Sequence, residues 1–333
     1  MSCAATTETW QRLKDFVASH QHFVLTCHVR PDCDALGSEL AMAEVLTQLG
    51  KQVRIINADE VPPRLAFVDP ERRIEVLPEG ATSLDSPVDA IIVLDTAAWG
   101  QLGRMADVIR HTTADVAIMD HHANPGEVDG LLIQDSSVEA TGRLIADFAQ
   151  YLHVDWTPGL AQALFVAIAT DTGWFRFPST RSSTYEVVGR LVAAGASPPE
   201  IFRQLYERDS LGRAKLRGIV LTRMTLEMGG QVAHTFVHDE DFQQTGALRS
   251  ETDDFINMAL AIEGVGVAAM FTEHPVGTIK VSLRSRLSAV DCSLVTEQFG
   301  GGGHRAAAGA TLQGDLSEVR SRVLAALRAA LAG

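Results

Sequence analysis

Residues 22–38 read HFVLTCHVRPDCDALGS and carry the pattern that decides the fold of the first half of the chain. The run from His22 to Cys27 is apolar almost throughout, as in a strand that is buried on both faces of a parallel sheet. A polar loop follows, and a helical apolar period then covers residues 35–49 and stops at Gly50. A buried strand that leads through a polar loop into a helix predicts an α/β domain.

Three more apolar runs extend this predicted sheet, at residues 52–57, 90–95 and 116–120. Helical stretches alternate with them, which predicts an α/β fold with a doubly wound, mainly parallel sheet. In such sheets ligands gather where strands end and loops lead into helices. We predict a catalytic domain over residues 1–190.

The rest of the chain has a different pattern of predicted secondary structure. Residues 182–227 keep a helical pattern, broken at Gly195 and at Ser197-Pro198-Pro199, and we expect a helical linker over residues 191–227. A smaller α+β domain is predicted over residues 228–333. Its expected elements are strands at 231–237, 266–273 and 278–283, a helix at 252–262 and a terminal helix at 316–331.

The composition excludes several classes of protein. The chain has 333 residues, of which 46% are hydrophobic, and its formal net charge of −14 disfavours coating of long duplex nucleic acid. Its four cysteines form no CxxC pair and no disulfide framework. No apolar run approaches the ~20 residues that cross a bilayer and no signal peptide is visible, so we expect a cytoplasmic protein without a membrane partner.

Carboxylate and imidazole side chains follow the predicted strands. They are His28, Asp32 and Asp34 after the first strand, Asp95 and Asp120-His121-His122 at the ends of two others, and Asp171 at the end of a later helix. Parallel strands end at one edge of a sheet, so these groups should converge, and clustered carboxylates repel one another unless cations are present. The mixture of oxygen and imidazole ligands suits Mn²⁺ or Mg²⁺, with Zn²⁺ possible, and their number favours a two-metal site.

At these residues the sequence resembles the DHH phosphoesterase family. The segment from His28 to Ser38 matches the first family motif, and Asp95, Asp120-His121-His122 and Asp171 match the next three. GGGHRAAAG at residues 301–309 and VSLRS at residues 281–285 match the associated DHHA1 domain. The resemblance is closest to the compact two-domain branch of NrnA-type oligoribonucleases and 3′-phosphoadenosine 5′-phosphate phosphatases.

This resemblance implies two Mn²⁺ ions, or Mg²⁺ or another divalent ion, and a role for each ligand. One ion would take His28, Asp32 and Asp95, and the other would take Asp34, Asp95, His121 and Asp171. Asp120 would orient a ligand histidine, and His122 would face the substrate. A metal-bridged hydroxide would then attack phosphorus in line.

The glycine run at residues 300–303 has two interpretations. It is either a flexible turn or a nest of backbone N–H groups that leads into a tightly packed helix and binds phosphate. We favour a phosphate clamp that closes onto the metals across an interdomain cleft, formed by Arg284, Ser285, Gly302, Gly303 and His304. For Arg284, an exposed position on a strand is the alternative.

Trp174, Phe175 and Phe177 directly follow Asp171. We interpret these rings as core residues, while a base-stacking platform is the alternative.

The expected function is hydrolysis of oligonucleotides a few residues long, removal of the 3′-phosphate of 3′-phosphoadenosine 5′-phosphate, or both. A cyclic or linear dinucleotide phosphodiesterase is the alternative among enzymes, and a non-hydrolytic nucleotide-sensing module is the alternative of another class. The expected partners are therefore short oligonucleotides or a nucleotide bisphosphate. The resemblance also makes a homodimer a possible assembly.

Overall fold

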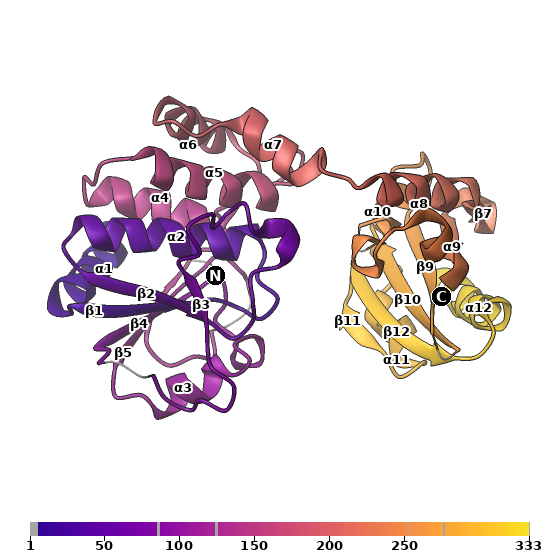
Figure 1. The fold of residues 1–333 in the computed structure, drawn as a ribbon, viewed down its shortest axis with the longest axis horizontal. Coiled ribbons are helices and arrows are strands. Elements are labelled where there is room, and N and C mark those ends of the chain that lie inside the picture. Colours follow the sequence, from indigo (N-terminus) through magenta and orange to yellow (C-terminus); the bar gives the residue numbers. More distant parts are fainter. Residues whose placement is uncertain (1–5, 85–86, 124–125, 253, 276, 333) are drawn as a thin grey trace. The chain divides into compact units, whose positions relative to one another are not determined.

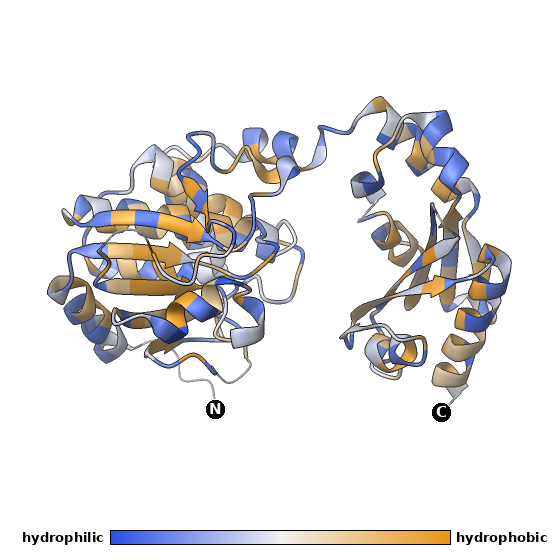
Figure 2. Cartoon of the chain, turned by 60° about the horizontal axis from the view of Figure 1, so that its bottom comes forward, coloured by the Kyte–Doolittle hydropathy of each residue, from blue (hydrophilic) through white to orange (hydrophobic). Residues whose placement is uncertain are grey.

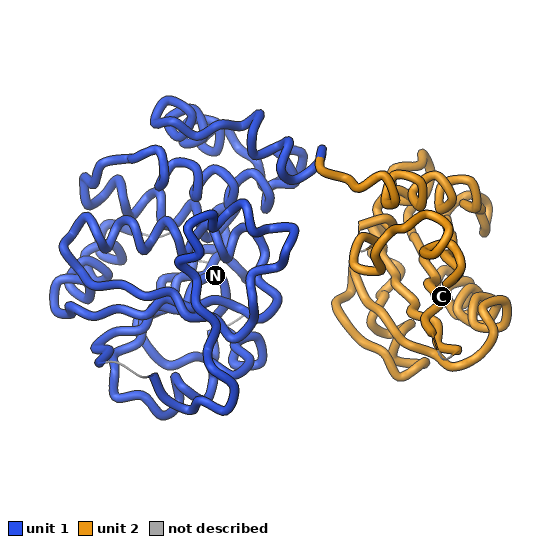
Figure 3. The backbone as a smooth tube through the Cα atoms, in the orientation of Figure 1, with its two compact units in different colours: residues 1–207 blue, residues 208–333 orange. Residues whose placement is uncertain are grey.

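A computed structural model of the chain describes residues 6–84, 87–123, 126–252, 254–275 and 277–332. It divides into two compact units, residues 1–207 and residues 208–333 (Figure 3). Each unit has its own six-stranded sheet and its own hydrophobic core. Among the described residues, no helix has the length and apolar character needed to span a membrane.

The first unit is built on a parallel sheet with the strand order β3-β2-β1-β4-β5-β6. The apolar runs at its centre are coloured as hydrophobic in Figure 2, and β4 is buried throughout, as expected of a strand that is covered on both faces. This confirms the predicted doubly wound sheet, and it adds two short strands, β3 and β6, that were not predicted. The strands are β1 (His22–Thr26), β2 (Gln52–Asn57), β3 (Ile74–Val76), β4 (Ala90–Leu94), β5 (Asp115–Asp120) and β6 (Leu131–Gln134).

Helices cover both faces of this sheet. Helices α2, α4 and α5 lie over one face and α3 lies over the other (Figure 1). The close approach of α2 to α5 depends on Gly37, where an added Cβ would come within 2.5 Å of the Ala163 carbonyl oxygen. The helices are α1 (Thr7–Ser19), α2 (Cys33–Gln48), α3 (Met105–His111), α4 (Thr141–Tyr151), α5 (Pro158–Asp171), α6 (Ser182–Ala193) and α7 (Pro198–Tyr206).

The strand order reverses direction between β1 and β4. These neighbouring strands lead to helices and strands on opposite sides of the sheet. In open α/β sheets, ligands bind beyond the carboxyl ends of strands at such a point. His28 follows β1 and Asp95 follows β4, so the fold places both residues at this switch point.

The second unit has a mixed sheet with the strand order β11-β12-β10-β9-β8-β7, in which only the β8–β9 pairing is parallel. Its strands are β7 (Thr225–Glu227), β8 (Val232–Val237), β9 (Val267–His274), β10 (Thr278–Ser285), β11 (Gly302–His304) and β12 (Ala307–Gln313). Its helices are α8 (Leu211–Thr222), α9 (Asp239–Thr245), α10 (Ile256–Leu260), α11 (Cys292–Glu297) and α12 (Leu316–Ala332).

Two predicted helices of this half are shorter in the structure than expected. The helical stretch expected up to residue 227 ends with α8, and β7 pairs with β8 instead. The helix expected at residues 252–262 is the short α10; Asp253 lies outside the described residues.

The glycine run does not lead into a helix. Gly302 to His304 form the edge strand β11, which pairs with β12. A Cβ on Gly301 would come within 2.3 Å of the Gly309 carbonyl oxygen, and one on Gly303 within 2.7 Å of the Ala307 carbonyl oxygen. These glycines are therefore required by close strand pairing, which a sequence pattern alone does not separate from a phosphate-binding turn.

Candidate metal centre

All the ligands predicted for the first unit lie at one edge of its sheet. His28 follows β1, and Asp32 caps the start of α2 through its bonds to the N–H groups of residues 34 and 35. Asp95 follows β4, and residues 120–122 lie at the end of β5. Asp171 is the last residue of α5. The close packing of α2 against α5 is what brings the helix-borne carboxylates to the strand-borne ones.

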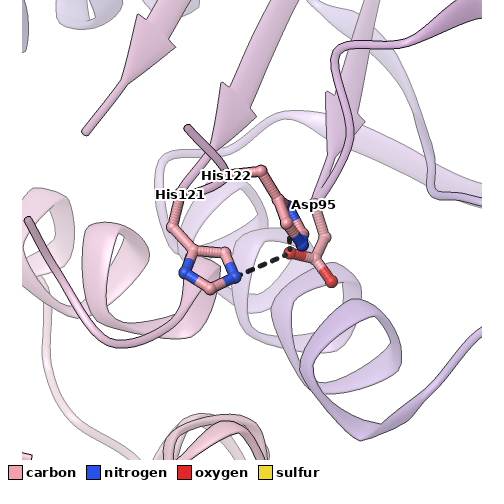
Figure 4. Close-up of side chains that lie close together, drawn as sticks. All are labelled: Asp95, His121 and His122. Atoms are coloured by element: carbon pink, nitrogen blue, oxygen red, sulfur yellow. Dashed lines mark ion pairs between the residues drawn. The ribbon is translucent and has the colours of Figure 1, made fainter. Parts of the chain in front are cut away.

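These side chains form two groups, which are joined by a third that contains Asp95, His121 and His122. In the first group, His28, Asp32 and Asp95 have ligand atoms within 4.8 Å of one another; the second group of the same size contains Asp34, His121 and Asp171. Oδ2 of Asp95 lies 3.4 Å from Nε2 of His28, while Oδ1 lies 3.7 Å from Nε2 of His121 (Figure 4). The two oxygens of one carboxylate therefore face the two groups.

The backbone of Asp95 is unusual. Its φ of +64° lies in the left-handed region, which few residues other than glycine, asparagine and aspartate adopt. The residue is 3% exposed, and its Oδ1 accepts a 2.8 Å hydrogen bond from the hydroxyl of Thr141. Strain of this kind concentrates at functional sites, where the surrounding structure holds it in place.

Asp34 is held by the start of α4. Its carboxylate accepts hydrogen bonds from the backbone N–H groups of Thr141 (2.8 Å) and Gly142 (2.9 Å). These are two of the N–H groups that a helix leaves without an internal partner, and they carry the positive end of the helix dipole. The helix thus compensates part of the cost of burying a carboxylate that is 1% exposed.

The pKa values show how poorly these carboxylates tolerate one another without a cation. Burial, followed by the charges of Asp34 and Asp32, raises the pKa of Asp95 well above its ordinary range. Burial also raises the pKa of Asp34, and burial with the charges of Asp34 and Asp32 raises that of Asp171 to about 7. Each shift records a preference for the neutral acid, which positive charge in the cluster would reverse.

His122 is half-exposed and is bound by Asp120. Oδ1 of Asp120 accepts from the ring Nδ1 at 2.7 Å and from the backbone N–H of His122 at 3.0 Å. The hydrogen bond to Asp120 is the main cause that raises the pKa of His122 to about 9. Asp120 was expected to orient a ligand histidine, and the bond goes to the neighbouring His122 instead.

The donor set fits divalent cations. The separations between histidine nitrogens and carboxylate oxygens across the two groups are 3.4 to 3.9 Å, too long for hydrogen bonds. Nitrogen and oxygen atoms that share an ion at about 2.1 Å lie roughly 3 to 3.5 Å apart, so small adjustments would complete both sites. Buried carboxylates with raised pKa values and imidazole nitrogens between them are the chemistry that such an ion stabilises.

In the second unit, two of the predicted substrate-binding side chains share one row of the sheet. Arg284 on β10 pairs with Ala307 on β12, which in turn pairs with His304 on β11. Directly paired residues project from the same face, so the arginine and the exposed histidine flank the small Ala307. The hydroxyl of Ser285 is nearly buried and exchanges hydrogen bonds with the backbone of Leu287. Gly302 and Gly303 are exposed on the edge strand.

Several residues of the centre were missed by the sequence analysis. Thr141 and Gly142 contribute mainly backbone N–H groups, and backbone donors leave no signal in a sequence. Glu39 of α2 is fully buried, and its Oε2 accepts from the side chain of Asn57, whose Oδ1 in turn accepts from the N–H of Cys27. It therefore supports the turn that carries His28. The one sequence feature that could have pointed to Glu39 is its acidic side chain within an otherwise apolar stretch of helix.

The chain belongs to the DHH family. The N-terminal domain of that family matches residues 22–168, and the DHHA1 domain matches residues 229–333. The chain is therefore a phosphoesterase, a hydrolase of phosphate esters.

Three individual proteins are similar to this chain over most of its length. The bifunctional oligoribonuclease and PAP phosphatase NrnA of Thermus thermophilus is 33% identical over 310 residues, which cover 91% of this chain and 88% of that protein. The cyclic-di-AMP phosphodiesterase GdpP of Geobacillus thermodenitrificans is 25% identical over 90% of this chain but only 46% of its own length. An exopolyphosphatase-related protein from Bacteroides fragilis shares the fold, with a TM-score of 0.89, 24% identity and coverage of 98% of both chains.

Proposed function

We propose that this phosphoesterase hydrolyses short nucleotides with the help of two Mn²⁺ ions. It releases mononucleotides from oligonucleotides a few residues long and removes the 3′-phosphate from 3′-phosphoadenosine 5′-phosphate. The observation that carries the proposal is the pair of ligand groups that meet at Asp95, in a chain that is similar over nearly its whole length to an oligoribonuclease and PAP phosphatase.

The proposed ligand sets follow the two groups of side chains. One ion would be held by His28, Asp32 and Asp95, and the other by the carboxylates of Asp34, Asp95 and Asp171 with the imidazole of His121. Asp95 belongs to both sets, because its two oxygens face different histidines. When bound, such ions activate water as a nucleophile and neutralise charge on the phosphoryl oxygens. Four carboxylates and two imidazoles suit Mn²⁺ better than Zn²⁺, which favours thiolate and imidazole.

His122 is proposed to manage a proton during the reaction. Its Nδ1 is held by Asp120, so Nε2 is the nitrogen that remains for the substrate. Asp120 raises the pKa of this imidazole, which favours the protonated ring as a donor to the leaving oxygen.

The second unit is proposed to bind a phosphate of the substrate that is not cleaved. Arg284 supplies a permanent positive charge, and His304 and the N–H groups of Gly302 and Gly303 supply further donors beside it. The common row of Arg284 and His304 supports this role. The hydroxyl of Ser285 has a smaller part, because it is already engaged with Leu287.

A phosphodiesterase for cyclic or linear dinucleotides is the second candidate. The similarity to the cyclic-di-AMP phosphodiesterase GdpP favours it, although the identity is lower.

A comparison of initial rates separates these candidates. 3′-Phosphoadenosine 5′-phosphate, a linear diribonucleotide, a cyclic dinucleotide and a five-residue RNA are assayed at equal concentration with Mn²⁺ and with a chelator. We expect Mn²⁺-dependent release of mononucleotide from the linear dinucleotide and of phosphate from the bisphosphate. Fastest turnover of the cyclic compound would favour the second candidate, and absence of turnover with all four would refute both.

A further inference from the structure

The segment that follows Asp171 contains an exposed aromatic ring that neither the core nor the metal ligands explain. Trp174 and Phe175 pack against the main core of the first unit, which confirms their interpretation as core residues. Phe177 does not: its side chain is 49% exposed, so the same interpretation was wrong for this ring. Single exposed apolar residues are common, and exposure alone assigns no role.

The backbone brings this ring back toward the metal ligand. Gly173, Trp174 and Phe175 all have positive φ values, of 57°, 60° and 63°, which turn the chain sharply at the end of α5. The N–H of Phe177 then donates to the carbonyl oxygen of Thr172, the residue next to Asp171. Successive bulky residues in the left-handed region are rare, and such strain persists where the surrounding structure fixes a functional geometry.

The ring occupies the place of a side chain at Gly173. A Cβ added there would lie 2.5 Å from Cζ of Phe177, so the ring covers this glycine directly. Gly173 is two residues from Asp171, and two trans peptide units span at most about 7.6 Å between Cα atoms. One side of the Phe177 ring thus lies on the turn that directly follows the proposed ligand, while the residue is 49% exposed.

Two contacts fix this turn in place at the end of α5. Nε of Arg176 donates to the carbonyl oxygen of Gly173, which holds a positive charge at the turn. The ring of Trp174 lies 5.8 Å from that of Tyr206 on α7, centroid to centroid. A cation and an exposed aromatic ring therefore belong to the turn that directly follows Asp171.

We infer that Phe177 is the surface on which the base of the bound nucleotide stacks, for the nucleotide whose phosphate lies at the metal ligands. This inference rests on the proposed function and adds the group that recognises the base. An aromatic face stacks on any of the bases, so it selects nucleotides over other phosphate esters without selecting a sequence. It makes this residue a determinant of specificity and assigns it no part in the chemistry.

The test compares ligands that differ only in the base. Binding of adenosine 5′-monophosphate and of ribose 5-phosphate is measured by calorimetry in the presence of Mn²⁺, for the native protein and for Phe177→Leu and Phe177→Tyr. Leucine keeps the apolar cover over Gly173 but removes the aromatic face, and tyrosine keeps that face. Tyr151→Ala is the matched control, because it removes a ring at the far end of α4, about 15 Å along the helix from Thr141.

We expect Phe177→Leu to weaken binding of the nucleotide about 5- to 100-fold and to leave ribose 5-phosphate unchanged. Phe177→Tyr and Tyr151→Ala should bind both ligands as the native protein does. An equal loss for both ligands, or no loss for the nucleotide, would overturn the inference. Failure of the proposed function is a separate result, seen as absence of hydrolysis by the native protein, since binding is measured without turnover.

Discussion

Replacing Asp95 by asparagine should stabilise the metal-free protein and strongly weaken its stabilisation by metal. In the native cluster the ligand oxygens of Asp95 and Asp32 lie within 4.8 Å of each other. At an effective dielectric constant of about 20, two charges at this separation repel by about 3.5 kcal/mol. Protonation relieves part of this repulsion and is the cause of the raised pKa of Asp95, but it too costs free energy at neutral pH.

Asparagine is a close substitute at this position in every other respect. Its side-chain oxygen can still accept from the hydroxyl of Thr141, and it tolerates the left-handed backbone as well as aspartate does. We therefore expect the unfolding free energy of the first unit to rise by about 2 to 3 kcal/mol in Asp95→Asn with a chelator at pH 7.5. For a unit of this size that is a rise of roughly 5 to 10 °C in melting temperature.

Unfolding by urea, followed by circular dichroism with and without Mn²⁺, measures both effects. Mn²⁺ should stabilise the native protein by about 2.7 kcal/mol at a hundred times its dissociation constant, and Asp95→Asn by much less. A variant that is less stable than the native protein in chelator would refute the account of charge repulsion. Equal stabilisation of both proteins by Mn²⁺ would refute the bridging position of this carboxylate.

Three further predictions concern the support of the site. Gly142→Ala places a Cβ 2.5 Å from the Ala167 Cβ and 3.3 Å from Oδ1 of Asp34, so it should lower the unfolding free energy in urea by about 1 to 3 kcal/mol and weaken Mn²⁺ binding. The control Gly189→Ala meets nothing within 4 Å and should be neutral or stabilising. Equal effects of the two substitutions would contradict the packing argument. Burial raises the pKa of Glu39 from 4.5 to about 8, so the metal-free protein should lose stability, on the order of 4 kcal/mol, as pH rises from about 4.5 to 8, and Glu39→Gln should flatten that profile; an unchanged slope would contradict it. Asp120→Asn removes the main cause of the raised pKa of His122, so an NMR titration should show that pKa falling from about 9 toward 6.5, and a value that stays near 9 would show that Asp120 does not hold the proton there.

The parts of the structure that could be predicted are the apolar strands and the polar side chains that directly follow them. The apolar runs were confirmed as the strands β1, β2, β4 and β5, of which β4 is buried throughout. His28 after β1 and Asp95 after β4 lie at the expected edge of the sheet. This worked because a strand buried on both faces needs a continuous apolar run and has few alternatives. Asp171 was found in the same way, from its place at the end of a helix.

The features that were not predicted depend on contacts between segments distant in sequence. The glycines of β11 are needed because β12 approaches them closely, and a phosphate-binding nest of backbone N–H groups would have the same glycine-rich sequence. The donors from α4 to Asp34 are backbone groups, which carry no residue signature. Phe175 and Phe177 are separated by one residue, yet the left-handed turn packs Phe175 against the core and leaves Phe177 exposed.

Anomalous diffraction from a crystal of the protein grown with Mn²⁺ tests the central claim most directly. We predict two manganese peaks in the first unit, one contacted by His28 and Asp32 and the other by Asp34, His121 and Asp171. The carboxylate of Asp95 should contact both peaks, through one oxygen or through both. A single peak, or two peaks of which only one contacts Asp95, would contradict the proposed two-metal centre.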